Sequence, residues 1–182
     1  MYRWIILFLL ACLAGCGSTP KVESPTLVMD GIDQVTRERV AQWKALVDTG
    51  SQWSDIQKLT SVNDFVNQLD FVDDSVHWKQ EDYWATPLQT LVTHGGDCED
   101  LAIAKYFTLN AMGMEEQKLR LTYVKALTIN KAHMVVSYFE QPHAEPMVLD
   151  NLNSRILPAS QRKDLLPVYS FNGAGLWLAK RG

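Results

Sequence analysis

Cysteine is scarce in this sequence, which has three in 182 residues. The formal net charge is also small, at −4, and this argues against the basic surface that nucleic-acid binding requires. The chain contains no internal repeat and no low-complexity segment, so repeat architectures are excluded. One domain with a full hydrophobic core fits the chain length and the hydrophobic content of 47%.

The longest apolar run covers residues 4–13 and follows Arg3. It is too short to span a bilayer comfortably, but a positive charge before such a run is typical of a signal peptide. The run ends at Leu13-Ala14-Gly15-Cys16, which resembles a bacterial lipobox, the motif at which the signal is removed and the new N-terminal cysteine is acylated. A plain secretory signal with a chance cysteine is the alternative. We therefore predict a lipoprotein signal peptide over residues 1–15 and lipidation at Cys16.

The residues after the lipobox predict where the protein resides. Position 17 is Gly rather than Asp, which favours the outer membrane under the sorting rule known for enteric bacteria. Residues 16–27 are largely polar and proline-containing, and we interpret them as a tether of about 30 Å if extended. Residues 28–182 then form the folded domain, anchored by lipid and facing the periplasm.

This predicted processing leaves one free thiol in the mature chain. Cys12 leaves with the signal peptide, and the sulfur of Cys16 carries lipid, so Cys98 has no partner. Exported proteins usually pair their thiols. An unpaired Cys98 is therefore either buried and inert or kept for its reactivity.

The apolar pattern predicts helices first and strands afterwards. Helices are expected over residues 33–48, 54–69, 86–93 and 98–112, and strands over residues 119–126, 134–139, 147–149, 168–171 and 176–178. The two first helices are predicted from apolar stripes, which comprise Val35, Val40, Trp43, Leu46 and Val47, and then Ile56, Leu59, Val62, Phe65, Val66 and Leu69. The segment 98–112 is nearly apolar all round, which is typical of a helix buried at the centre of a domain. The order indicates an α+β domain with an antiparallel sheet.

Cys98 is predicted at the N-terminus of this central helix, where unpaired N–H groups and the helix dipole favour a thiolate. Gly95-Gly96 precedes it, and we expect the two glycines to let the backbone approach a substrate closely. His133 opens one predicted strand and Asp150 follows another, so a base and a residue that orients it are both available at strand ends.

Spacing alone leaves other readings of these residues open. A cysteine at a helix start is usually structural, a histidine beside a strand is usually on the surface, and Asp150 could simply make a turn. Three further histidines compete with His133 for the role of base, namely His77, His94 and His143.

A resemblance to a known family favours the catalytic reading. The segment from Gly95 to Tyr106, GGDCEDLAIAKY, resembles the signature of the bacterial transglutaminase-like cysteine proteinases, and further similar blocks occur over most of the mature chain, at residues 83–87, 119–124, 133–135, 148–152 and 168–172. The resemblance implies a papain/transglutaminase-like core, with the nucleophile on a central helix packed against an antiparallel sheet. It also implies that Cys98, His133 and Asp150 are the catalytic nucleophile, base and orienting carboxylate.

Three carboxylates surround the predicted nucleophile, at Asp97, Glu99 and Asp100. Acidic residues are common in the first turn of any helix, but carboxylates this close to a thiol disfavour its ionisation. A bound dication would reverse that effect. The resemblance implies calcium dependence, with ligands among these three residues, although the spacing is not that of an EF-hand loop.

The resemblance further implies a calcium-dependent cysteine endopeptidase of the cell envelope. Its substrate would be a large repeat adhesin at the cell surface, cut near its N-terminus at a site with paired alanines, which releases the adhesin and disperses a biofilm. An inner-membrane receptor for cyclic-di-GMP would sequester and inhibit the enzyme. Family members are often soluble in the periplasm, whereas this chain carries a lipobox. The alternatives are a transglutaminase or amidase with the same triad, and a catalytically silent, calcium-dependent binding lipoprotein.

Overall fold

The computed structural model describes residues 31–179. The predicted signal peptide, the predicted lipidation site Cys16 and the predicted tether lie outside the described residues. Within them, no helix is both long and apolar enough to cross a membrane. The described residues form an α+β fold with helices in the first part and a sheet in the second, which confirms the predicted fold class.

Five helices precede the main sheet, and capping boxes explain where two of them begin. They are α1 (Gln34–Gly50), α2 (Asp55–Val66), α3 (Asp74–His77), α4 (Pro87–Thr93) and α5 (Cys98–Ala111). Ser54 and Thr86 each accept a hydrogen bond from the backbone N–H three residues on and are completed to capping boxes by Gln57 and Gln89. These two starts agree with the predicted ones.

Six antiparallel strands form the sheet, in the order β6-β5-β4-β3-β7-β8. Their bounds are β3 (Leu119–Ala126), β4 (Lys131–Tyr138), β5 (Met147–Leu149), β6 (Leu157–Pro158), β7 (Leu165–Asn172) and β8 (Gly175–Leu178). Two short 3₁₀ turns, Glu116–Lys118 and Ala159–Gln161, flank the strands. A separate two-residue parallel pair joins β1 (Asp70–Phe71) to β2 (Gly95–Gly96).

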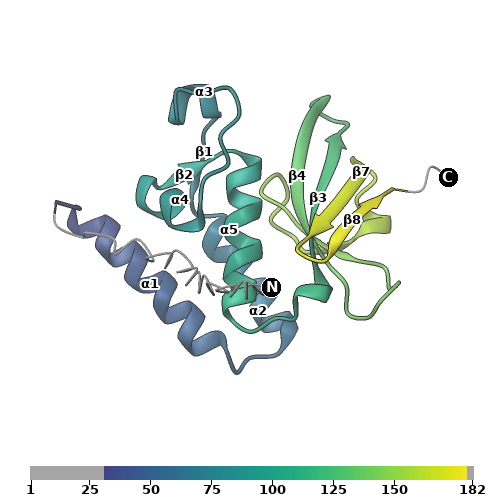
Figure 1. The fold of residues 1–182 in the computed structure, drawn as a ribbon, viewed down its shortest axis with the longest axis horizontal. Coiled ribbons are helices and arrows are strands. Elements are labelled where there is room, and N and C mark those ends of the chain that lie inside the picture. Colours follow the sequence, from purple (N-terminus) through teal and green to yellow (C-terminus); the bar gives the residue numbers. More distant parts are fainter. Residues whose placement is uncertain (1–30, 180–182) are drawn as a thin grey trace, which may run out of the picture. The chain divides into compact units, whose positions relative to one another are not determined.

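The central helix α5 lies between the other helices and the sheet (Figure 1). One face of β3 and β4 packs on it, and the inward residues of these strands belong to the same hydrophobic core, including Leu119, Leu121, Met134 and Val136. Burial on nearly all sides, with Phe107 as an exposed exception, explains why the segment is apolar all round. The N-terminus of α5, with Cys98, is therefore held rigidly beside the sheet.

Several details differ from the sequence prediction. Val35 and Ile56 are exposed rather than buried. Val35 lies about 140° around the helix from the buried Val40, and Ile56 precedes the first buried residue of α2. The second helix ends at Val66, three residues early, although Leu69 is buried beyond its end. The strand β6 was not predicted, because two residues carry no periodicity.

The two glycines before Cys98 serve the protein's own packing. A Cβ on Gly95 would lie 2.7 Å from the backbone oxygen of Asp70, and one on Gly96 would lie 2.4 Å from a carboxylate oxygen of Asp100. The expected space for a substrate backbone is thus filled by β1 and by a side chain of α5. We conclude that the absence of a side chain at these glycines lets the backbone of Asp70 and the side chain of Asp100 pack against them.

Candidate active site

Cys98 is the first residue of α5 and has only 8% of its surface exposed. Asp97 caps the helix, since its carboxylate accepts hydrogen bonds from the backbone N–H groups of Glu99 and Asp100. The thiol lies 2.7 Å from Oε2 of Glu99 and donates to it. Burial, and then the negative charge of Glu99, raise the pKa of Cys98 far above its ordinary value. In this conformation the thiol is protonated.

His133 and Asp150 form a buried pair. His133 lies near the start of β4, Asp150 follows β5, and His133 Nε2 is 2.6 Å from Asp150 Oδ1. Burial acts to raise the pKa of Asp150, but hydrogen bonds from His133 and Arg162 outweigh it and hold the pKa at about 2. Because Asp150 is then a carboxylate at neutral pH, Nε2 of His133 must donate the hydrogen bond. This leaves Nδ1 free to accept a proton.

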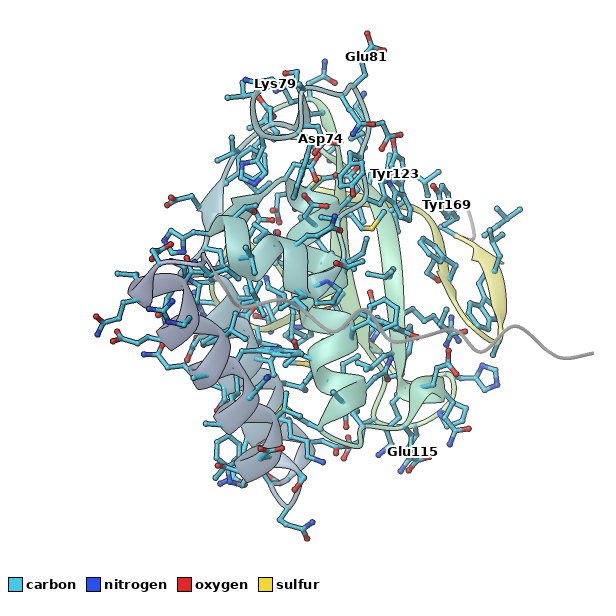
Figure 2. The ribbon with its side chains drawn as sticks, turned by 60° about the vertical axis from the view of Figure 1, so that its left-hand side comes forward. Asp74, Lys79, Glu81, Glu115, Tyr123 and Tyr169 are labelled. Atoms are coloured by element: carbon cyan, nitrogen blue, oxygen red, sulfur yellow. The ribbon has the colours of Figure 1, made fainter. Side chains whose placement is uncertain are left out.

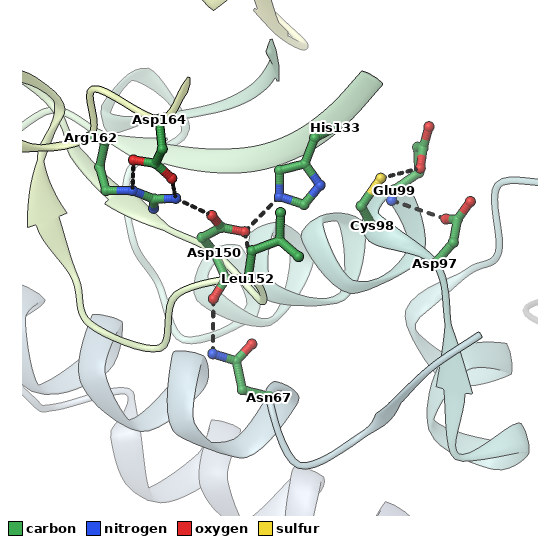
Figure 3. A network of polar contacts seen from close by, with 9 residues as sticks. All are labelled: Asn67, Asp97, Cys98, Glu99, His133, Asp150, Leu152, Arg162 and Asp164. Carbon is green, nitrogen blue, oxygen red and sulfur yellow. Dashed lines mark hydrogen bonds and ion pairs between the residues drawn. The ribbon is translucent and has the colours of Figure 1, made fainter. Parts of the chain in front are cut away.

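Cys98 and His133 line the same pocket, which has a volume of about 150 Å³. Figure 3 shows the imidazole ring between Asp150 and Cys98. The competing histidines lie elsewhere: none of them lines this pocket, His77 bonds Thr93, and His94 is a left-handed C-cap near Asp70. The structure therefore brings together the three residues of the predicted triad. Their catalytic roles stay a prediction, because the thiol here contacts Glu99 and not His133.

Arg162 is a further residue of the site that the sequence gave no reason to select. It is 2% exposed, its Nη2 lies 2.6 Å from Asp150 Oδ2, and it also pairs with Asp164 (Figure 3). The backbone N–H of Leu152 and the side-chain amide of Asn67 add hydrogen bonds to Asp150. Arg162 follows a short 3₁₀ turn in a segment without periodicity, so no pattern pointed to it.

Replacing Arg162 by methionine should destabilise the fold. The substitution leaves Asp150 buried with one cationic partner fewer, and breaking a buried pair in this way costs about 3 kcal/mol of unfolding free energy. Urea unfolding measures this. The control is Asp164→Asn. Because the Asp164 carboxylate is partly exposed, this substitution should lower the unfolding free energy by less than about 1 kcal/mol. Equal effects of the two substitutions would contradict the role given to Arg162.

The carboxylates near Cys98 form two groups that share Asp97. Possible ligand atoms of Asp97, Cys98 and Glu99 lie within 4.8 Å of one another, and so do those of Asp74, Asp97 and Asp100. Asp74 comes from α3 and was not predicted as a ligand. In Figure 2 its side chain points inward, whereas Lys79 and Glu81 of the same segment project outward.

The second group has the character of a cation site. Burial raises the pKa of Asp97 to about 8, and the charges of Glu99, Asp74 and Asp100 add to this. Asp100 is fully buried and accepts from Trp78 and the backbone of Ala85. Oδ1 of Asp74 is buried without a hydrogen-bond partner among the described residues. Three carboxylates this close, one with an unpaired oxygen, fit a hard dication with oxygen ligands.

The chain belongs to the bacterial transglutaminase-like cysteine proteinases, whose family model matches residues 29–171. It is therefore a cysteine peptidase. A particular relative is LapG of Legionella pneumophila: an EGTA-treated structure is 48% identical, with a TM-score of 0.77, over 82% of this chain and 80% of that one. A calcium-bound structure of the same protein is 49% identical, with a TM-score of 0.75, over 81% and 82%.

A more distant structure shares the fold alone. It is a putative cysteine protease from Cytophaga hutchinsonii, 12% identical with a TM-score of 0.51, and the match covers 73% of this chain and 42% of that chain. No protein in the comparison with curated sequences matches this one.

Proposed function

We propose that the chain is a calcium-dependent endopeptidase of the cell envelope that cuts a large repeat adhesin near its N-terminus and so controls biofilm attachment. The observation that carries this proposal is the buried His133–Asp150 pair beside Cys98, in a chain that is 48% identical to LapG. An inner-membrane receptor for cyclic-di-GMP is proposed as its inhibitor.

The proposed reaction is acyl transfer through a thioester. Nδ1 of His133 takes the thiol proton of Cys98, and the sulfur attacks the carbonyl carbon of the scissile peptide. The same imidazole then gives the proton to the leaving amine. Water, deprotonated by His133, hydrolyses the thioester and restores the thiol. Asp150 holds the ring through Nε2, and the backbone N–H of Cys98, which does not donate to the Asp97 cap, stabilises the oxyanion.

Calcium enters this proposal through the carboxylates. Asp74, Asp97 and Asp100 would hold the ion, with Glu99 as a further ligand. When bound, the ion supplies positive charge that offsets the carboxylates around the nucleophile. The LapG structures described as calcium-bound and EGTA-treated support the choice of this ion. Of the three ligands predicted from sequence, Asp97 takes part in both groups, whereas Asp100 and Glu99 fall into different ones.

The base and its orienting carboxylate should act as one unit. His133→Ala and Asp150→Ala should each lower kcat/KM by about 10³-fold or more. The double variant should be as active as the less active of the two single variants. Matched controls are His94→Ala and His143→Ala, which lie outside the Cys98 pocket and should keep full activity. A control as damaging as His133→Ala would refute the assignment.

The reaction type is tested with an adhesin fragment that carries paired alanines, incubated with calcium and an amine donor. The proposal expects two fragments with a new N-terminus at the pair. Crosslinked or amine-labelled fragment without cleavage would instead establish a transglutaminase. No reaction, together with tight binding of the fragment, would establish a silent binding protein.

The lipobox makes a separate prediction about location. Cys16→Ser should move the protein from the membrane fraction to the soluble periplasmic fraction, because the acylated sulfur is lost. Activity on a soluble adhesin fragment should not change, since the active site lies within the described domain. A wholly soluble unmutated protein in fractionated cells would contradict the prediction of a lipid-anchored, outer-membrane protein.

A further inference from the structure

A second cavity, of about 380 Å³, lies on the face of the sheet opposite α5. Strand alternation explains its lining. Leu119 and Leu121 of β3 face α5, whereas Arg120, Thr122 and Val124 face the cavity. It shares no lining residue with the pocket of Cys98. Its volume lies at the lower end of the range for small-molecule sites.

The floor of this cavity is apolar and its polar groups are largely satisfied. Val124, Val135 and Val148 form a buried cluster against which Leu165 packs, and all four line the cavity. The hydroxyl groups of Thr122 and Ser137 bond each other at 2.7 Å. The floor therefore suits an apolar ligand and makes little demand for hydrogen bonds.

Two arginines give the cavity its polarity. The guanidinium of Arg120 lies 4.4 Å from the ring centre of Phe139 and 3.8 Å from that of Trp177, so it is held in place by two aromatic faces. In the described part of the chain no carboxylate pairs with Arg120, and its Nε has no hydrogen-bond partner. Among residues 31–179, no carboxylate lines the cavity.

The second arginine is Arg162, which also lines the cavity and is 2% exposed. Its Nη1 is buried and lacks a partner among the described residues, while Nη2 donates to Asp150 and both Nη2 and Nε donate to Asp164. Buried N–H groups without partners are costly, and they indicate a missing acceptor. An acceptor with a planar, negatively charged group matches two guanidinium groups best.

We propose that this cavity binds an amphiphilic carboxylate, whose apolar part packs on the valine floor and whose carboxylate pairs with Arg120 and accepts from Arg162. The ligand is a fatty acid or the C-terminus of an apolar peptide. Arg162 also donates to Asp150. It would therefore lie between the bound carboxylate and the His133–Asp150 pair.

Calorimetry with the full chain tests this with four probes. Octanoate and octanol share the apolar part and differ in charge, so octanoate should bind at least tenfold more tightly. An N-acetylated apolar dipeptide with a free carboxylate represents the peptide source, and its amide is the uncharged control. The tighter of the two carboxylates identifies the source of the ligand. Equal affinity of the charged and uncharged probes, or no binding, would overturn the proposal.

Two neighbouring residues of β7 provide a matched pair of variants. Leu165 lines the cavity and Leu166 is exposed. Leu165→Trp should therefore weaken octanoate binding at least tenfold, and Leu166→Trp should leave it unchanged. Should Leu165→Trp fail to fold, Arg120→Leu serves instead: it should weaken octanoate binding at least tenfold, because one of the two guanidinium partners of the carboxylate is lost. Unchanged octanoate binding by folded Leu165→Trp or by Arg120→Leu would place the ligand elsewhere.

Discussion

Cys98→Ser is expected to lower peptidase activity by about 10⁴-fold or more while the fold is retained. The hydroxyl is nearly isosteric with the thiol but far harder to ionise, so His133 cannot generate a comparable nucleophile. The site offers no substitute, since Cys98 is the sole free cysteine among the described residues. Cleavage of an adhesin fragment, followed by mass spectrometry, measures the loss.

Retention of the fold in this variant needs its own measurement. Cys98 is almost fully buried against the core, so circular dichroism and thermal unfolding of Cys98→Ser should match the unmutated chain within a few degrees. A folded Cys98→Ser protein that still cuts at the original rate would show that another residue is the nucleophile.

Chelation of calcium with EGTA is expected to lower activity at least 100-fold, and added calcium, but not magnesium, should restore it. Without a cation, four carboxylates lie around the nucleophile, and Glu99 accepts a hydrogen bond from the protonated thiol. Calcium accommodates an irregular set of carboxylate ligands, whereas magnesium demands a tight octahedron and keeps its waters. Calorimetry on chelator-treated protein measures binding, and fragment cleavage measures activity.

Variants of the carboxylates separate this site from an ordinary helix start. Asp97→Asn keeps a side chain that can cap α5, and Asp74→Asn keeps the shape of the α3 side chain, but each removes one charged ligand. Both should lose calcium binding and activity together, as should Glu99→Ala. Asp64→Asn, on the exposed side of α2, is the control. Full activity in EGTA, together with no heat of calcium binding, would contradict the calcium site and assign these carboxylates a structural role only.

Local rules carried much of the fold prediction. Ser54 as a cap and Pro87 in a first turn predicted the start of two helices, and the all-round apolar character of residues 98–112 placed the central helix within one residue of its end at Ala111. The strand β3 was predicted with its observed bounds, whereas β4 and β7 were predicted shorter than observed, at residues 134–139 and 168–171. The two-residue strand β6 and the parallel pair β1–β2 are set by long-range pairing, which no local pattern contains.

The site was predictable only where its residues lie near recognisable elements. Cys98 opens a helix, and His133 and Asp150 lie near strand ends, so the chain itself suggested all three. Arg162 and Asp74 reach the site through tertiary contacts from a loop and from a four-residue helix. The density of acidic residues between 70 and 82 was the one available signal for Asp74, and it did not single out a ligand.

We expect Cys98 to be a nucleophile whose ionisation depends on the charge of the surrounding carboxylates. The rate of Cys98 alkylation by iodoacetamide at pH 7 tests it directly, because only the thiolate reacts and no substrate is needed. Burial and Glu99 raise the pKa of the thiol in the metal-free protein, so we expect alkylation at least tenfold faster in calcium than in EGTA. We also expect His133→Ala to abolish most of that acceleration. Equal rates in calcium and in EGTA would contradict the account.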